Sequence, residues 1–195
     1  MITTEQIKDL RDKTGISVMQ CKKALEEAGG DMEKALILLR KKGAEVAAKK
    51  GDRTLGAGVI ASYIHGNGTV GAIVELACET DFVSNNEEFK ALARDIAMQV
   101  AATNPDFLSS GDIDEAARAK ASEVFAKETE GKPEELKAKI LEGKITSYFA
   151  DKILLEQPFI KNDDLTIATL ISNAVQKFGE KTEIVRFSRF SVGGK

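Results

Sequence analysis

Apolar positions in the first 50 residues recur at helical spacing, in short stretches separated by turn residues. Two pairs have the spacing of a capping box, in which two side chains bond free N–H groups at a helix start: Thr3 with Gln6, and Ser17 with Gln20. After Ser17, apolar residues recur every three or four positions: Val18, Cys21, Leu25 and Ala28. Gly29 and Gly30 end this helix, and Asp31 caps the next one, which runs toward Lys50. The pattern predicts a small bundle of three helices.

The period changes after a glycine-rich linker at residues 51–58. Residues 59–65 and 70–78 are apolar runs with many β-branched side chains, a composition typical of strands. Residues 66–69 join the two runs and have Asn-Gly at their centre, which favours the tight turn of an antiparallel hairpin. We therefore expect a β-hairpin at this point of the chain.

The rest of the chain returns to helical spacing and ends in a strand-like run. The predicted helices are 84–104, 113–127, 133–155 and 165–178, and the predicted closing strand is 183–190. The second and third of these helices follow each other closely, so we expect them to form an antiparallel helical hairpin. A β-hairpin, several helices and a lone closing strand predict an α+β fold with a mainly antiparallel sheet.

The charge balance argues against a protein that binds nucleic acid directly. The 195 residues carry a formal net charge of −3, whereas a protein that neutralises phosphates usually presents a basic face. A group of lysines invites that interpretation nonetheless: Lys41, Lys42, Lys49 and Lys50. These cations also suit a solvated helix end, where they complement the helix dipole, and we prefer this second interpretation.

Cysteine usage and the length of apolar runs indicate the cytoplasm. Cys21 and Cys78 lie in apolar surroundings without C-x-x-C spacing, so we expect no disulfide framework. No run approaches the roughly 20 apolar residues of a membrane span. The first residues also lack the basic and apolar blocks of a secretion signal. We expect a cytoplasmic protein that does not enter a membrane.

No group of residues in the sequence has the pattern of a catalytic centre. The single histidine, His65, ends a strand-like run away from any obvious nucleophile, so we interpret it as a packed or surface residue. Residues 66–71 match G-x-G-x-x-G, but a dinucleotide site needs a helix after this motif and here a strand follows. The sequence contains no P-loop motif. We therefore expect no enzyme, no cofactor and no metal site.

The most informative stretch is residues 78–83. It follows a buried strand and precedes a capped helix, which places an acid, Asp81, beside a large aromatic, Phe82, on a tight turn. Composition favours a Phe82 that fills the core. The alternative is an exposed wedge, because loop tips held between rigid elements often carry binding residues.

Three ordered blocks of the sequence resemble the elongation factor Ts family, and the likeness spans nearly the whole chain. The blocks are TGISVMQCKKAL at 14–25, ELACETDFV at 75–83 and LEQPFIK at 155–161. The resemblance implies a ubiquitin-associated-like three-helix domain over residues 1–54. It implies an α+β core domain with a helical hairpin over residues 55–195.

The family resemblance also implies a function, guanine-nucleotide exchange on elongation factor Tu during translation. It implies that Asp81 and Phe82 push into the partner's GTPase domain near its bound magnesium, and that Thr80 and Val83 complete this element. The small domain is then expected to dock on the same partner through four side chains: Arg11, Val18, Met19 and Lys22. Such a chain needs no metal ligand and no cofactor of its own.

The resemblance further implies a homodimer, because longer members carry a second core half that 195 residues do not hold. No dimer interface can be named from the sequence. Ser188 lies near the chain end, where some short relatives have a cysteine, so a covalent dimer at that point is excluded. The alternative to an exchange factor is an interaction module, a ubiquitin-associated-like bundle that binds a peptide or a ribosomal partner without exchange activity.

Overall fold

The computed structural model describes residues 2–128 and 134–194, and its first part is a bundle of short helices. These helices are α1 (Thr4–Thr14), α2 (Val18–Glu27) and α3 (Met32–Lys49). Their buried apolar side chains form one cluster that includes Leu10, Ile16, Cys21, Leu25 and Leu39. The three helices predicted for the N-terminal part are therefore confirmed.

Side-chain caps explain where these helices begin. Thr3 accepts a hydrogen bond from the Gln6 backbone N–H at 3.2 Å, and the Gln6 side chain accepts from the Thr3 N–H at 2.9 Å. Ser17 caps α2, and Asp31 caps α3, each by accepting a backbone N–H bond. Gly15 ends α1 with a φ of 69°, a conformation that glycine adopts without steric cost.

The second part of the molecule is built on an antiparallel sheet. The strands β1 (Ala57–Ile64), β2 (Val70–Cys78) and β5 (Thr182–Ser191) lie in the order β1-β2-β5. At the end of the predicted hairpin, the His65 N–H donates to the Val70 carbonyl at 2.8 Å. The G-x-G-x-x-G match is therefore a hairpin turn followed by a strand, as expected. The α+β fold with an antiparallel sheet is confirmed.

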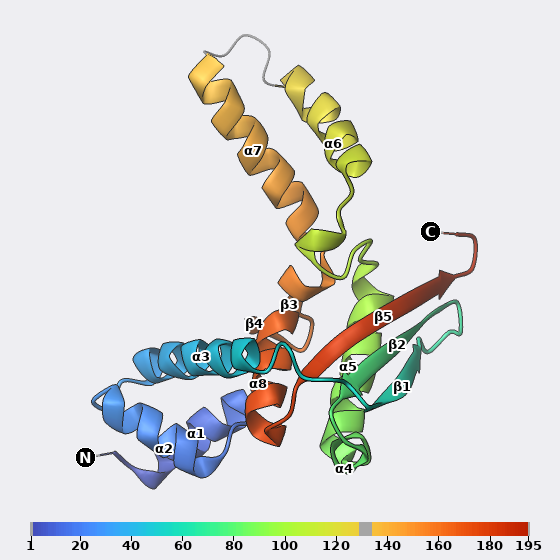
Figure 1. Cartoon of the computed structure of the whole chain (residues 1–195). Helices are drawn as coiled ribbons and strands as arrows, with labels where there is room; N and C mark the ends of the chain where they lie inside the picture. The colour runs from blue at the N-terminus through green and yellow to red at the C-terminus, as the bar shows by residue number, and fades with distance from the viewer. Residues whose placement is uncertain (1, 129–133, 195) are drawn as a thin grey trace.

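The main core lies between this sheet and the helices that cover it. The helix α5 (Glu87–Thr103) contacts β1 and β2, while α8 (Ile167–Phe178) contacts β5 and α3 (Figure 1). The fully buried side chains come mainly from β2 and α5, and they include Val74, Leu76, Phe89, Ile96, Val100 and, from α8, Ile167. Because α8 packs against both β5 and α3, it joins the N-terminal bundle to the second part.

A helical hairpin projects away from the sheet (Figure 1). Its helices are α6 (Glu115–Glu128) and α7 (Glu134–Ala150), which contact each other side by side. The predicted hairpin is confirmed, although Pro133, where we placed the start of its second helix, lies outside the described residues. An apolar cluster joins the base of the hairpin to the core: Ile113, Ala121, Phe149 and Ile153.

The segment before the last helix differs from the prediction. It forms a small antiparallel pair, β3 (Pro158–Phe159) and β4 (Asn162–Thr166). We expected helix from Leu165, but α8 begins at Ile167. Thr166 is its N-cap, and the Thr166 hydroxyl accepts from the Thr169 N–H at 3.2 Å. This cap fixes the start of α8 after β4 has ended.

Candidate functional site

A short helix that periodicity did not predict lies at the end of the central strand. This helix, α4 (Asp81–Ser84), follows β2 directly, and α5 begins at Glu87 rather than at Ser84. Asn86 caps α5 by accepting a bond from the Glu88 N–H at 2.8 Å. The element predicted to enter the partner is therefore the N-cap and first residues of a separate turn of helix: Thr80, Asp81, Phe82 and Val83.

Two neighbouring side chains of α4 differ widely in exposure. Val83 is 3% exposed and packs in the main core, whereas Phe82 is 82% exposed. Successive residues of a helix are about 100° apart around its axis, so the burial of Val83 turns Phe82 toward solvent. The composition-based interpretation of Phe82 as a core residue is therefore wrong. The structure shows the alternative, an exposed aromatic on a short helical turn.

Polar side chains surround the exposed ring. Asp81, Asn85 and Asn86 line an open hollow of about 480 Å³ together with Phe82. Asp81 is itself exposed. Large aromatic side chains that can be buried by a partner dominate the binding energy of many interfaces. The pair of a carboxylate and an exposed ring is therefore suited to enter a partner.

Two buried side chains donate hydrogen bonds to backbone carbonyl groups of this element. The Cys78 thiol donates to the Thr80 carbonyl with an S–O distance of 3.2 Å, and the Ser84 hydroxyl donates to the Asp81 carbonyl at 3.1 Å. Burial raises the pKa of the Cys78 thiol, so this group stays a neutral donor at pH 7. Cys21 is also buried, and both cysteines are free.

The predicted docking side chains of the N-terminal bundle are exposed as well: Arg11, Val18, Met19 and Lys22. Arg11 lies in the last turn of α1, and the other three lie at the start of α2. Met19 is 82% exposed, and Lys22 forms an ion pair with Glu26 at 3.8 Å. Figure 1 shows α1, α2 and α4 at the same lower end of the molecule, opposite α6 and α7. The elements that carry both sets of predicted residues therefore lie at that end.

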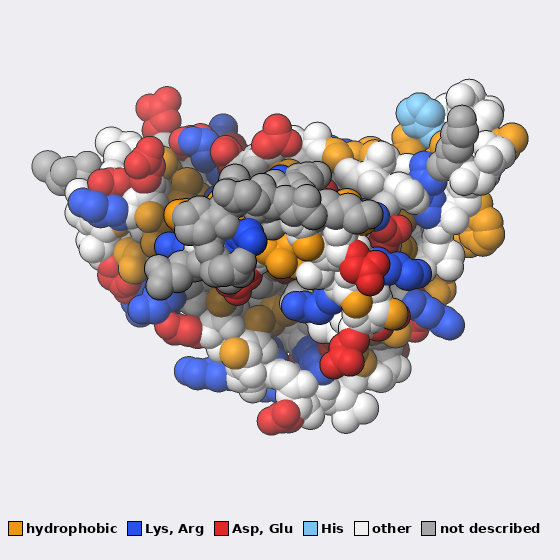
Figure 2. Space-filling view, turned by 90° about the horizontal axis from the view of Figure 1, so that it is seen from above, with side chains coloured by type: hydrophobic (Ala, Val, Ile, Leu, Met, Phe, Trp, Pro, Cys, Tyr) orange, Lys and Arg blue, Asp and Glu red, His pale blue; other side chains and the backbone are white. Residues whose placement is uncertain are grey.

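Two of the four lysines in the second half of α3 and at its C-cap form contacts within the molecule. Lys42 pairs with Glu27 at 2.6 Å, and the Lys50 Nζ donates to the Gly179 carbonyl at 2.5 Å. On the face seen in Figure 2, Lys and Arg side chains are interspersed with Asp and Glu. These contacts favour the interpretation of the lysines as a solvated helix end.

The single histidine and the acidic side chains were also considered as possible site residues. His65 is exposed, and its Nδ1 lies 3.2 Å from the Tyr63 hydroxyl. Across residues 2–128 and 134–194, no group of three or more His, Cys, Asp and Glu side chains is placed to hold a metal ion. None of the helices in these ranges combines the length and the apolar character needed to cross a bilayer.

Known proteins are similar to this chain over almost its full length. A family model described as Elongation factor TS matches residues 8–194. The elongation factor Ts of Carboxydothermus hydrogenoformans is 47% identical over 99% of this chain and 90% of its own length. That of Thermodesulfovibrio yellowstonii is 48% identical over 98% of this chain and 96% of its own length. The chain therefore belongs to the elongation factor Ts family of translation elongation factors.

Proposed function

We propose that this chain is a guanine-nucleotide exchange factor that promotes the release of GDP from elongation factor Tu. The observation that carries the proposal is the 82% exposure of Phe82 beside a Val83 that is 3% exposed. Because Val83 anchors the turn in the core, Phe82 can enter a partner with little further loss of conformational freedom. A preorganised side chain of this kind loses less free energy on binding than a flexible one.

The exchange requires no covalent chemistry by this chain. Asp81 and Phe82 displace the groups of the partner that hold its magnesium and the phosphates of GDP. A protein that binds the empty GTPase more tightly than the GDP-bound form must weaken GDP binding by the same factor. A coupling of about 1–3 kcal/mol changes that affinity about 5–150-fold. GTP then fills the site, so this chain acts without a metal ion or cofactor of its own.

A second contact holds the same partner through the N-terminal bundle: Arg11, Val18, Met19 and Lys22. We infer that residues 1–54 and 55–195 act as two domains, each with its own apolar cluster. Binding at two linked places raises the effective concentration of Phe82 at the nucleotide site. The setting of this function is the cytoplasm, where translation elongation takes place, and it needs no direct contact with nucleic acid or a membrane.

The first test is stopped-flow release of a fluorescent GDP analogue from elongation factor Tu. We expect the full-length chain to raise the release rate about fivefold or more, because a weaker hold on GDP lets the nucleotide dissociate faster. Binding to elongation factor Tu without any acceleration contradicts the exchange function. That result favours the alternative, an interaction module that uses the exposed Val18 and Met19.

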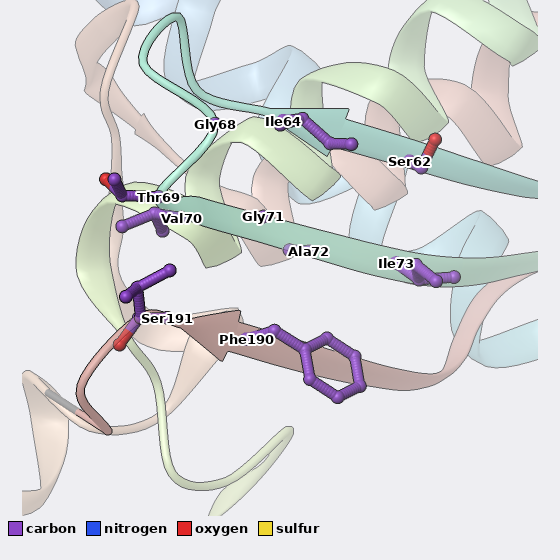
Figure 3. A pocket seen from close by; sticks show the side chains of 11 residues that line it. Ser62, Ile64, Gly68, Thr69, Val70, Gly71, Ala72, Ile73, Phe190 and Ser191 are labelled. Carbon is purple, nitrogen blue, oxygen red and sulfur yellow. The ribbon is translucent and has the colours of Figure 1, made fainter.

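The chain is further proposed to form a homodimer through the outer face of its sheet. The face opposite α5 exposes apolar side chains from each strand, among them Ile60, Ile64, Ile73 and Phe190. Ile64, Ile73 and Phe190 help to line a pocket of about 490 Å³. Figure 3 shows how these side chains lie on the three strands. Several exposed apolar side chains on one face, here beside the Glu75–Arg186 ion pair, are typical of interaction sites. A second copy presents the same patch, and a two-fold axis brings the two together.

Replacing Ile73 with lysine is expected to convert the dimer into monomers. Ile73 lies on the central strand between Ser62 and Ser188, so a charge at this point loses its water when a second copy binds. We expect the dissociation constant from sedimentation equilibrium to rise more than about 30-fold, the effect of one central interface residue. Ile37→Lys, at an exposed position on α3, is the matched control and should leave the constant unchanged. A wild-type chain that stays monomeric at every concentration contradicts the dimer.

A further inference from the structure

The element that carries Phe82 is too short to hold its own shape. α4 has four residues, and isolated helices of that length are not stable in water. Its N-cap residue, Thr80, makes no side-chain capping bond to the helix. The Thr80 hydroxyl is bonded instead to an acid that lies 100 residues further along the chain. The conformation of α4 therefore depends on contacts from outside its own segment.

Glu180 holds Thr80 by two hydrogen bonds. The Thr80 N–H donates to one carboxylate oxygen at 3.0 Å, and the Thr80 hydroxyl donates to the other at 2.5 Å. Bidentate bonds to a carboxylate fix orientation as well as distance, and they are stronger than bonds between neutral groups. Glu180 follows Gly179, whose φ of 72° ends α8 and turns the chain toward β5. The carboxylate thus ties α4 to the loop between α8 and β5.

The residue before Thr80 is bonded to the same loop. The Glu79 carboxylate accepts from the Lys181 N–H at 2.5 Å and from the Arg53 guanidinium at 2.9 and 3.2 Å. The bond from the Lys181 N–H is the main cause that lowers the pKa of Glu79. The Lys181 Nζ also donates to the Gly51 carbonyl at 2.8 Å. The end of β2, the α8–β5 loop and the linker are thus joined beside Glu180.

We propose that Glu180 is a positioning residue for nucleotide exchange, because it holds Thr80 so that Asp81 and Phe82 meet the partner in one orientation. This inference rests on the exchange function proposed above. Without the carboxylate, Thr80 loses two bonds that come from a distant part of the chain, and α4 samples other conformations. The fraction of molecules with Phe82 in the productive orientation falls, and the apparent affinity for the partner falls by the same fraction.

The test is GDP release from elongation factor Tu with the full-length chain and its Glu180→Ala and Glu180→Gln variants. We expect Glu180→Ala to lower the acceleration about tenfold, the effect of losing hydrogen bonds to a charged group. Glu180→Gln should keep most of the activity, because its amide oxygen accepts from the Thr80 N–H and its amide N–H donates to the Thr80 hydroxyl. Glu123→Ala is the matched control, an exposed glutamate on α6, away from α4 and the α8–β5 loop.

A double-mutant cycle separates positioning from a general loss of stability. If Glu180 acts through Phe82, Glu180→Ala changes the rate less than about twofold in a Phe82→Ala background. Amide hydrogen exchange gives a second readout that does not depend on the partner. The Thr80 amide should lose protection in Glu180→Ala, while the Val74 amide in the central strand keeps its protection.

Two results overturn the positioning role and leave the exchange function intact. One is full activity of Glu180→Ala, and the other is an equal loss of rate in the wild-type and Phe82→Ala backgrounds. If the wild-type chain does not accelerate GDP release from elongation factor Tu, the exchange function is contradicted, and the positioning role is contradicted with it. Thermal unfolding of each variant verifies that the assay temperature lies below the transition, so that no loss of rate comes from unfolded protein.

Discussion

Replacing Phe82 with alanine is expected to lower the acceleration of GDP release more than about 30-fold, with almost no change in stability. A buried aromatic at the centre of an interface contributes about 2 kcal/mol or more, and each 1.4 kcal/mol is about tenfold. Phe82 is 82% exposed in the free chain, so its removal takes away few contacts within the fold. Substitutions at such positions change the free energy of unfolding by about 0.5 kcal/mol or less.

The measurement for Phe82→Ala is stopped-flow GDP release from elongation factor Tu over a range of variant concentrations. Val124→Ala is the matched control, because Val124 is also an exposed apolar residue but lies on α6, away from α4. The control variant should accelerate GDP release from elongation factor Tu as much as the wild-type chain does. If Phe82→Ala and Val124→Ala behave alike, the ring does not act in exchange, and another part of the chain must carry the activity.

Local signals explain why the helices and the hairpin could be predicted. The capping pair Thr3 and Gln6 is three residues apart, and the turn at 66–69 lies between the two strands that it joins. In each case the residues that determine the structure are close in sequence, so their pattern is visible before the fold is known. The start of α8 was harder to predict, because leucine and threonine are acceptable both in a strand and at the start of a helix. In the structure Leu165 and Thr166 belong to β4.

The direction of Phe82 could not be predicted, because it depends on packing between distant segments. Phe82 and Val83 are adjacent apolar residues, and either one could have faced the core. The outcome depends on how α4 sits against β1, β2 and α5, all of which contact it. Three polar residues close to Phe82 in the sequence indicated that this ring is exposed: Asp81, Asn85 and Asn86. The interpretation from composition did not take them into account.

Two further features of the structure were missed, for different reasons. The contact between Thr80 and Glu180 spans 100 residues and has no sequence pattern. The outer face of the sheet had a visible signal, since Ile60 and Ile64 alternate with the inward Val59 and Tyr63. Antiparallel sheets commonly turn a polar face to water, so the exposed Ile60 and Ile64 on the outer face of β1 support the proposed second copy. The roles of the site residues and the boundary at residue 54 stay predictions.

Replacing Phe89 with alanine is expected to have the opposite effect to Phe82→Ala, a large loss of stability. Phe89 is 0% exposed in the main core, and its ring meets the Phe178 ring edge-on with centroids 5.7 Å apart. Truncating a buried phenylalanine lowers the free energy of unfolding by about 3–5 kcal/mol, because apolar burial is lost and a cavity remains. Domains of this kind have about 5–15 kcal/mol in total, so the loss is a large share.

Urea unfolding followed by far-ultraviolet circular dichroism measures this loss, since the chain has no tryptophan to report by fluorescence. All variants are compared at one protein concentration, because a dimer makes apparent stability depend on it. Ile37→Ala, at an exposed apolar position on α3, should change the free energy by about 0.5 kcal/mol or less. A loss below about 1 kcal/mol for Phe89→Ala contradicts the packing of α5 against α8. Phe82 and Phe89 lie seven residues apart, yet Phe82 is expected to act on the partner and Phe89 on the stability of the fold. The difference arises because Phe82 faces outward from α4, whereas Phe89 faces the core from α5.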